Sequence, residues 1–165
     1  MMLTLPSERE IWTALEEVKD PEIPVVSVVE MGIVRSVELK KDGVEVAMTP
    51  TFSGCPALRV MHDDIEAKMR ELGFEEVEVK TVLSPPWSTD WITEAAKAKL
   101  HEFGVAPPAP VGEDEGLIQL EPSPAACPRC GSFDTSTKNT FGPTLCKSIH
   151  VCNRCIESFE AFKSV

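Results

Sequence analysis

The chain has 165 residues, a net charge of −11 and a hydrophobic content of 42%. These values allow one ordinary domain with a folded core and a small appendage. The acidic balance disfavours binding to nucleic acid or to an anionic membrane surface, because both need clustered Lys and Arg. No apolar run approaches the ~18 residues of a membrane span, and the first ten residues lack a secretory-signal pattern. We therefore expect a cytoplasmic protein, whose six cysteines are metal or redox ligands rather than a disulfide framework.

The first part of the chain alternates between helical and extended patterns. Ser7-Glu8-Arg9-Glu10 has the form of a capping box and predicts a helix that ends before Pro21. Extended segments are predicted at 25–29, 32–39, 44–48 and 75–83, and Asp42-Gly43 indicates a hairpin between the second and third of these. Helices are predicted at 57–72, stopped by Gly73, and from a cap at Ser88 or Thr89 to Gly104. The order helix-strand-strand-helix-strand-helix predicts an α+β fold, a small mixed sheet covered by helices.

Cys55 is the first candidate site residue, because it lies between a predicted strand and a predicted helix. It belongs to Thr49-Pro50-Thr51-Phe52-Ser53-Gly54-Cys55-Pro56, in which Pro56 suits the first helical position. A thiol at a helix N-terminus faces unpaired N–H groups and the positive end of the helix dipole, so we expect its pKa to be lowered. Such a thiolate could hold a soft metal or attack an electrophile. The alternative is a buried cysteine that only closes a strand–helix corner.

The chain is predicted to divide into three parts. Residues 1–104 form the α+β domain, and residues 105–126, rich in Pro and acidic residues, form a semi-rigid linker. Residues 127–165 carry two C-x₂-C pairs, whose sulfurs are Cys127, Cys130, Cys152 and Cys155. Two such turns complete a tetrahedral S₄ set, which predicts a zinc ribbon with structural Zn²⁺ in preference to an iron–sulfur cluster. Two strands, 135–140 and 144–151, are predicted between the pairs.

Cys146 is the remaining cysteine of this tail and does not fit either pair. In an extended segment it lies on the side of Thr144, Ser148 and His150. A small packing residue is the favoured interpretation, while an exposed secondary thiol, an alternative ligand and a redox partner stay open. His150 could also be a ligand, but the two complete pairs leave no vacancy for it.

Several motifs of the chain resemble a known family. Val18–Pro24, Glu30–Val34 and Thr49–Pro56 resemble the domain of metal–sulfur (iron–sulfur) cluster assembly factors. With Ser84–Ile92 and the Cys127–Cys155 tail added, the whole chain resembles the PaaD family, the accessory subunits of the ring-1,2-phenylacetyl-CoA epoxidase in phenylacetate degradation. The resemblance covers nearly all of the chain, with its motifs in the right order.

The resemblance implies an accessory role, in which the chain helps to assemble or maintain an iron–sulfur or di-iron centre of the oxygenase. It implies the other epoxidase subunits, oxygenase or reductase, as partners, and a transient iron–sulfur cluster or iron as cargo. Cys55 would then be a transient ligand or a sulfur-handling thiolate, with Asp20 and Glu22 as neighbours that tune the site. No Glu-x-x-His motif or Gly-rich nucleotide loop occurs in the sequence, so we do not expect the chain to be the oxygenase itself.

Two other functions compete with the assembly role. A structural or docking subunit would bind the epoxidase through its zinc ribbon and would need no chemistry at Cys55. A thiol-redox enzyme would use Cys55 and Cys146, but no redox-type C-x-x-C occurs outside the ribbon. The oligomeric state is left open by the sequence, and a homo-oligomer is compatible with it.

Overall fold

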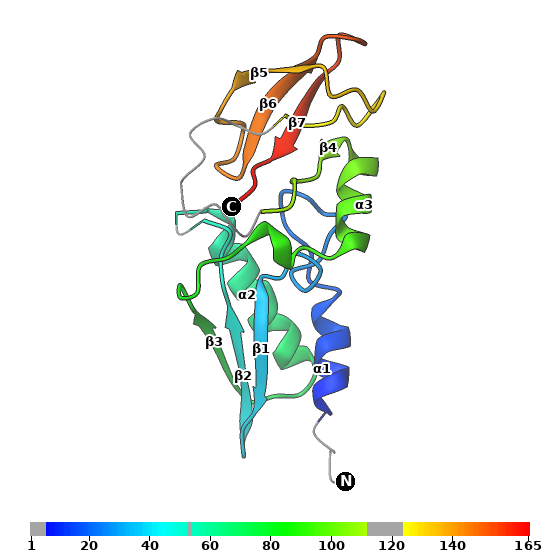
Figure 1. Ribbon diagram of the computed structural model, residues 1–165. Helices are drawn as coiled ribbons and strands as arrows, with labels where there is room; N and C mark the ends of the chain where they lie inside the picture. The colour runs from blue at the N-terminus through cyan, green and yellow to red at the C-terminus, as the bar shows by residue number, and fades with distance from the viewer. Residues whose placement is uncertain (1–5, 53, 112–123) are drawn as a thin grey trace. The chain divides into compact units, whose positions relative to one another are not determined.

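The computed structural model of the protein describes residues 6–52, 54–111 and 124–165 (Figure 1). It divides into two units, Met1–Trp87 and Ser88–Val165. Each unit has its own sheet. Within the described residues, no helix is long and apolar enough to span a membrane.

The first unit is a three-stranded sheet with two helices. In chain order it contains α1 (Glu8–Leu15), β1 (Val34–Leu39), β2 (Gly43–Met48), α2 (Ala57–Glu71) and β3 (Glu76–Thr81). The strand order is β1-β2-β3, with β1 and β2 antiparallel and β2 and β3 parallel. The parallel pair requires a crossover, and α2 supplies it. The α+β class predicted from the sequence is confirmed.

Local signals in the sequence explain where these elements begin and end. Ser7 caps α1 in a reciprocal capping box with Glu10, which satisfies N–H groups that have no partner inside the helix. The hairpin between β1 and β2 closes at the predicted Asp42-Gly43 turn, where the Lys40 N–H donates to the Gly43 carbonyl at 2.9 Å. Gly73, with a φ of +97°, ends α2, since glycine adopts this left-handed conformation without a Cβ clash.

The core of the first unit lies between the sheet and the helices. Both helices lie against the same face of the sheet, and α1 and α2 contact each other (Figure 1). In β2 the side chains alternate, so that Val44, Val46 and Met48 are buried while the residues between them are half-buried. The helices add apolar stripes to this face, namely Ile11 and Leu15 from α1 and Met61, Ile65 and Met69 from α2.

The prediction of a strand at 25–29 is wrong. These residues form turns, with only an isolated bridge between Lys19 and Ser27. The chain folds back on the end of the first helix instead, because the Val28 N–H donates to the Val18 carbonyl at 3.0 Å. Val26 and Val28 are nevertheless completely buried, so the apolar pattern reflects burial in a folded-back loop rather than a place in the sheet.

Charged side chains of the sheet form an ion-pair network centred on Glu45. Its carboxylate accepts hydrogen bonds from Lys40 and from Lys80, and Lys40 also contacts Glu78 at 2.9 Å. The hydrogen bond from Lys40, followed by that from Lys80, lowers the pKa of Glu45 to about 2. The network therefore stabilises the ionised form of this carboxyl group.

Glu45→Gln is expected to lower the stability of the first unit at pH 7 and to flatten its dependence on pH. The folded pKa of about 2 lies below the ordinary value of 4.5. The contribution is therefore complete above about pH 4.5 and is lost as the pH falls toward 2. Hydrogen exchange of the β2 amides at pH 7 and at pH 3 measures the effect. Glu75→Gln, at an exposed position outside the network, is the control, and an equal effect in both variants would contradict the assignment.

The second unit contains the cysteine-rich strands. It comprises a 3₁₀ turn (Thr89–Trp91), α3 (Glu94–Phe103), β4 (Val105–Ala106), β5 (Thr135–Asn139), β6 (Lys147–Cys152) and β7 (Ser158–Phe162). Ser88 caps the 3₁₀ turn and Thr93 caps α3, so the predicted helix start at Ser88 or Thr89 lies one turn too early. The sheet has the order β4-β7-β6-β5, and β7 was not predicted.

The boundary between the units differs from the predicted one at Gly104. β4 pairs with β7 in parallel, with Ala106 opposite Ala161. Residues 105–106 therefore belong to the ribbon sheet rather than to the linker, and α3 is grouped with that sheet as well. Of the linker predicted at 105–126, residues 112–123 lie outside the described residues.

Candidate functional site

The four cysteines of the two C-x₂-C pairs converge in the second unit. Cys127 and Cys130 come from the loop before β5, whereas Cys152 ends β6 and Cys155 lies in the turn that leads to β7. Their sulfur atoms all lie within 4.8 Å of one another. In the described part of the chain, no other group of three or more His, Cys, Asp or Glu residues converges in this way. The structure therefore brings together the four cysteines that the sequence named as metal ligands.

The spacing of the sulfurs fits a tetrahedral metal. Cys127 Sγ lies 3.7 Å from Cys155 Sγ, and Cys130 Sγ lies 3.5 Å from Cys152 Sγ. A tetrahedron with metal–sulfur bonds of ~2.3 Å, as for Zn²⁺, places its sulfurs ~3.8 Å apart. Four thiolates at this spacing form a closed set with no open position for catalysis, so the arrangement is that of a structural site.

Backbone groups hold the two turns in place. Gly131 follows the first pair with a φ of +71°, and Ile156 follows the second at the corresponding position with a φ of +61°. The N–H of Cys155 lies 3.5 Å from Cys152 Sγ and is the largest of several hydrogen bonds that together lower the pKa of that thiol to about 7. An amide that stabilises a thiolate also favours metal binding, because the ligand must lose its proton.

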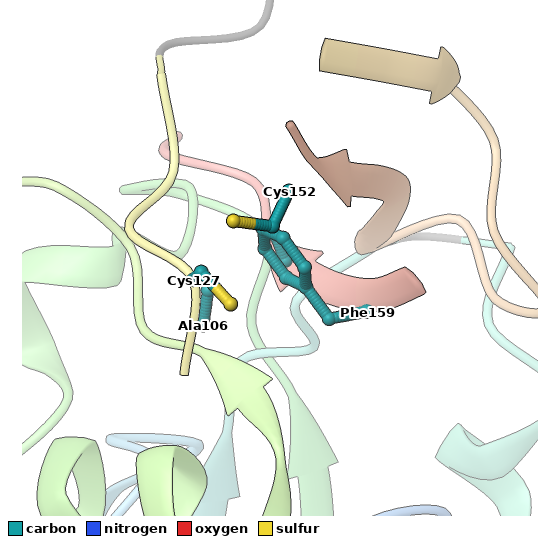
Figure 2. Close-up of a cluster of buried hydrophobic side chains, with 5 residues drawn as sticks. Ala106, Cys127, Cys152 and Phe159 are labelled. Atoms are coloured by element: carbon teal, nitrogen blue, oxygen red, sulfur yellow. The ribbon is translucent and has the colours of Figure 1, made fainter. Parts of the chain in front are cut away.

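A small hydrophobic cluster supports the metal site. Cys127 and Cys152 are completely buried and pack with Phe159, Ala161 and Ala106. Figure 2 shows the Phe159 ring beside the two cysteines, with Ala106 next to Cys127. Phe159 and Ala106, which come from β7 and β4, were not predicted from the sequence. The sequence indicates β7 only by apolar residues at alternate positions, Phe159 and Ala161, and this pattern is too short to identify a strand.

Cys146 and His150 lie outside the metal ligand set. Cys146 is half-buried, and its sulfur lies 3.2 Å from the hydroxyl of Thr144. His150 is buried, and its Nε2 lies 2.8 Å from the Ser148 hydroxyl. Its ring also stacks on Phe159, with centroids 5.6 Å apart. His150 therefore takes part in the packing of the ribbon. This agrees with the expectation that two complete cysteine pairs leave no ligand position for it.

Cys55 lies at the start of α2 in the first unit, but it does not cap the helix. Pro56 occupies the N-cap position and no side chain caps this end. The Cys55 carbonyl instead accepts the N–H of Leu58 at 3.1 Å, and its own N–H donates to the Phe52 carbonyl. The side chain is half-buried at the surface of the unit.

The prediction that the pKa of Cys55 is lowered is wrong. Burial raises the pKa of the thiol and is the largest influence. The backbone N–H groups of Ala57 and Leu58 lower it, as the helix-terminus argument expected, but the charges of Glu22 and Asp20 raise it further. The net shift is upward, so the protonated thiol prevails at neutral pH.

The loop that carries Asp20 and Glu22 therefore lies within electrostatic range of Cys55. The Asp20 carboxylate accepts the N–H groups of Glu22 at 2.8 Å and of Ile23 at 3.0 Å. This bonding fixes the turn around Pro21, and it makes Asp20 a positioning residue of the loop. Glu22 is exposed and contributes its negative charge beside the thiol.

Comparisons with known proteins match both units. The family described as "Iron-sulfur cluster assembly protein" matches residues 8–81, and the family described as "PaaD zinc beta ribbon domain" matches residues 114–163. An α+β domain of the iron–sulfur assembly type joined to a zinc ribbon is thus the class of protein that the fold and the sites define. The chain belongs to the PaaD family. It is 39% identical over 160 residues, 97% of this chain and 94% of the other, to a protein of Escherichia coli (strain K12) that is named as a component of the 1,2-phenylacetyl-CoA epoxidase.

Other relatives match the first part of the chain. The "Fe-S protein maturation auxiliary factor YitW" of Bacillus subtilis (strain 168) is 36% identical over 92 residues, 54% of this chain and 89% of that protein. A crystal structure of a "Domain of Unknown Function DUF59" from Bacillus anthracis has a TM-score of 0.52 at 31% identity, covering 56% of this chain and 90% of that one. The "Conserved Hypothetical Protein TM0487" of Thermotoga maritima has the same TM-score at 27% identity, covering 60% and 98%.

Proposed function

We propose that this protein is a maturation factor of a phenylacetyl-CoA epoxidase, and that it helps to assemble or maintain an iron–sulfur or di-iron centre of the multicomponent oxygenase. Its place in phenylacetate catabolism and its partners, the oxygenase or reductase subunits, rest on the family of the chain. Cys55 is the residue that handles the cargo. The ribbon holds a structural Zn²⁺ at Cys127, Cys130, Cys152 and Cys155. The assembly domain would then handle the cargo, and the ribbon would have a structural role.

The observation that carries the proposal is the setting of Cys55. A nucleophilic cysteine at neutral pH needs a lowered pKa, because the thiolate is the reactive form. Burial and two carboxylates instead raise the pKa of Cys55. The same carboxylates attract a cation. An arriving Fe²⁺ displaces the thiol proton, so that one Cys55–S–Fe bond forms and one proton leaves, with no change in oxidation state.

The site is suited to a cargo that stays briefly. Among the residues that the structure describes, Cys55 is not part of a converging metal cage, so a single protein thiolate would bind the cargo. The remaining ligands would come from the cargo itself or from the recipient protein. Weak, incomplete coordination allows release, which a transfer factor needs and a structural site does not.

The test compares wild type, Cys55→Ala and the matched control Cys146→Ala, each purified anaerobically from iron-supplemented cells. We expect one zinc per chain in all three. Iron or cluster-like absorbance is expected in wild type and Cys146→Ala and is expected to be absent from Cys55→Ala. Co-expressed oxygenase and reductase should contain less iron with Cys55→Ala than with the control. Equal iron loading in all three proteins would refute the role of Cys55.

A docking subunit that binds through the ribbon is the second candidate, and one observation favours it. Phe133 and Ile156, which follow the two cysteine pairs, are 71% and 75% exposed. Ile156 also holds a positive φ, a strained conformation for a β-branched residue. If docking is the function, the double substitution Phe133→Ser and Ile156→Asn abolishes association with the epoxidase subunits while the zinc is retained, and Cys55→Ala has no effect.

A further inference from the structure

The second unit contains a partly open cavity of about 520 Å³ that has no role in the metal site or at Cys55. Its volume lies within the range of ~300–1,000 Å³ that is usual for small-molecule sites. Its walls are mainly apolar, with Pro107 and Pro108 following β4 and Phe133 preceding β5. Among its polar lining residues are Ser148 and His150 from β6 and Lys163 after β7.

The polar lining comes from one face of the β6–β7 pair. Ser148 pairs with Ala161 and His150 pairs with Phe159 across the two strands, so these side chains share a face. Both Ser148 and His150 are only 2% exposed, and their side chains lie 2.8 Å apart, between Ser148 Oγ and His150 Nε2. They give a mainly apolar cavity a fixed hydroxyl and a fixed imidazole.

Lys163 continues this face two residues beyond Ala161. Its backbone N–H donates to the Cys146 carbonyl at 2.9 Å, and its ammonium group donates to the Leu145 carbonyl at 2.9 Å. The same Nζ lies 4.5 Å from the centroid of the Phe141 ring. An ammonium group has three donors, so it can make further hydrogen bonds beyond the one to Leu145.

The ammonium group of Lys163 has no carboxylate ion-pair partner among the described residues. Lys147, on the neighbouring strand, forms an ion pair with Glu160, whereas no carboxylate of the described residues lies within ion-pair distance of Lys163. Burial lowers the pKa of Lys163, and the neighbouring Cys146 thiol opposes this shift. A half-buried cation that no carboxylate pairs with, at a cavity with mainly apolar walls, is suited to a single negative charge on an apolar ligand.

We propose that this cavity binds a small carboxylate whose apolar body packs against the proline and Phe133 walls and whose oxygens accept hydrogen bonds from Lys163. A phosphate dianion is disfavoured, because it would require several cationic or backbone donors and the lining is mostly apolar. A flat ring suits the walls, since proline and aromatic side chains present flat apolar surfaces. The site is separate from Cys55 and does not depend on the assembly role.

The test uses the full-length, zinc-loaded protein and follows backbone amide resonances by NMR. The probes are phenylacetate, which joins one ring to one carboxylate, its neutral counterpart 2-phenylethanol, and acetate. Phenylacetate is expected to produce saturable shifts at Ser148, His150, Ala161 and Lys163. Acetate and 2-phenylethanol, each lacking one of the two recognised parts, are expected to bind at least about tenfold more weakly.

Variants separate the charge from other effects. Lys163→Met is expected to weaken phenylacetate binding about tenfold and to leave 2-phenylethanol unchanged, while Lys163→Arg keeps most of the affinity. Lys138→Met removes an equal charge from β5, outside the cavity lining, and is the matched control. Ala109→Trp, at an exposed position of the rim, is expected to block binding even if Lys163→Met fails to fold.

Several results would overturn the proposal. They are the absence of saturable shifts, shifts that lie outside the cavity, equal binding of 2-phenylethanol and phenylacetate, or equal weakening by Lys138→Met and Lys163→Met. Zinc content, measured on every variant, shows whether the ribbon is folded.

Discussion

Cys152→Ser is expected to remove the metal from the second unit and to unfold its sheet while the first unit stays folded. Cys152 is completely buried, and its sulfur lies 3.5 Å from Cys130 Sγ. The substitution therefore removes one of the four sulfurs at a buried position of the ligand set. Structural Zn²⁺ contributes on the order of 10 kcal/mol to folding, and only a few apolar residues pack around the site. A core of this size cannot replace that contribution.

The measurement combines metal analysis with hydrogen exchange. In Cys152→Ser we expect less than one metal ion per chain and fast exchange of the β6 and β7 amides, with β2 still protected, because β1, β2 and β3 pair within the first unit. Cys146→Ser is the control, because it makes the same chemical change directly before β6 but outside the ligand set. This variant should keep the metal. Protected β6 amides in metal-free Cys152→Ser would show that the ribbon folds without the ion.

Gly43→Ala is expected to destabilise the first unit by about 2–3 kcal/mol, an overpacking cost that arises at a backbone contact. A Cβ at Gly43 would lie 2.7 Å from the Glu76 Cβ and would collide with the Glu76 carbonyl oxygen. Gly43 is paired with Glu76 at the first position of the parallel β2–β3 ladder. The clash is with the main chain, so a change of side-chain rotamer cannot relieve it, and the ladder itself must shift.

Gly54→Ala is the matched control for this substitution. A Cβ at Gly54 would meet no atom within 4 Å, so the change should leave stability within about 0.5 kcal/mol of wild type. Hydrogen exchange of the β2 and β3 amides, measured on the full-length protein, gives the local free energy for each variant. Equal protection in both variants would mean that the start of β3 shifts at little cost in free energy, and that the close approach of Gly43 to Glu76 is unimportant for stability.

The features that the sequence predicted are those determined by neighbouring residues. The capping box of Ser7 and Glu10, the Asp42-Gly43 turn and the stop at Gly73 each act over a few positions, and all are present. The grouping of the four cysteines was predictable for a similar reason, because each C-x₂-C pair is a local turn. Convergence of the two pairs then follows from the pairing of β5 with β6.

The features that it did not predict depend on contacts between distant segments. β4 has only two residues, and it forms because it pairs with the edge of β7. Val105 lies opposite Glu160, which is 55 positions later in the chain. The pKa of Cys55 depends on burial and on carboxylates that a folded-back loop brings near from residues 20–22. Local sequence correctly indicated N–H groups at the helix start, but it could not weigh them against desolvation.

The pairing of β4 with β7 has a consequence for how the ribbon can be isolated. The zinc-ribbon family match begins at residue 114, after β4, so a fragment cut at that position would lack the strand that covers β7. It would expose the backbone donors and acceptors of Ser158–Phe162, in a strand that contains Phe159, Ala161 and Phe162. Uncovered strand edges of this kind recruit further chains. A fragment that begins at Ser88 keeps β4 in place and should remain monodisperse where the shorter one aggregates.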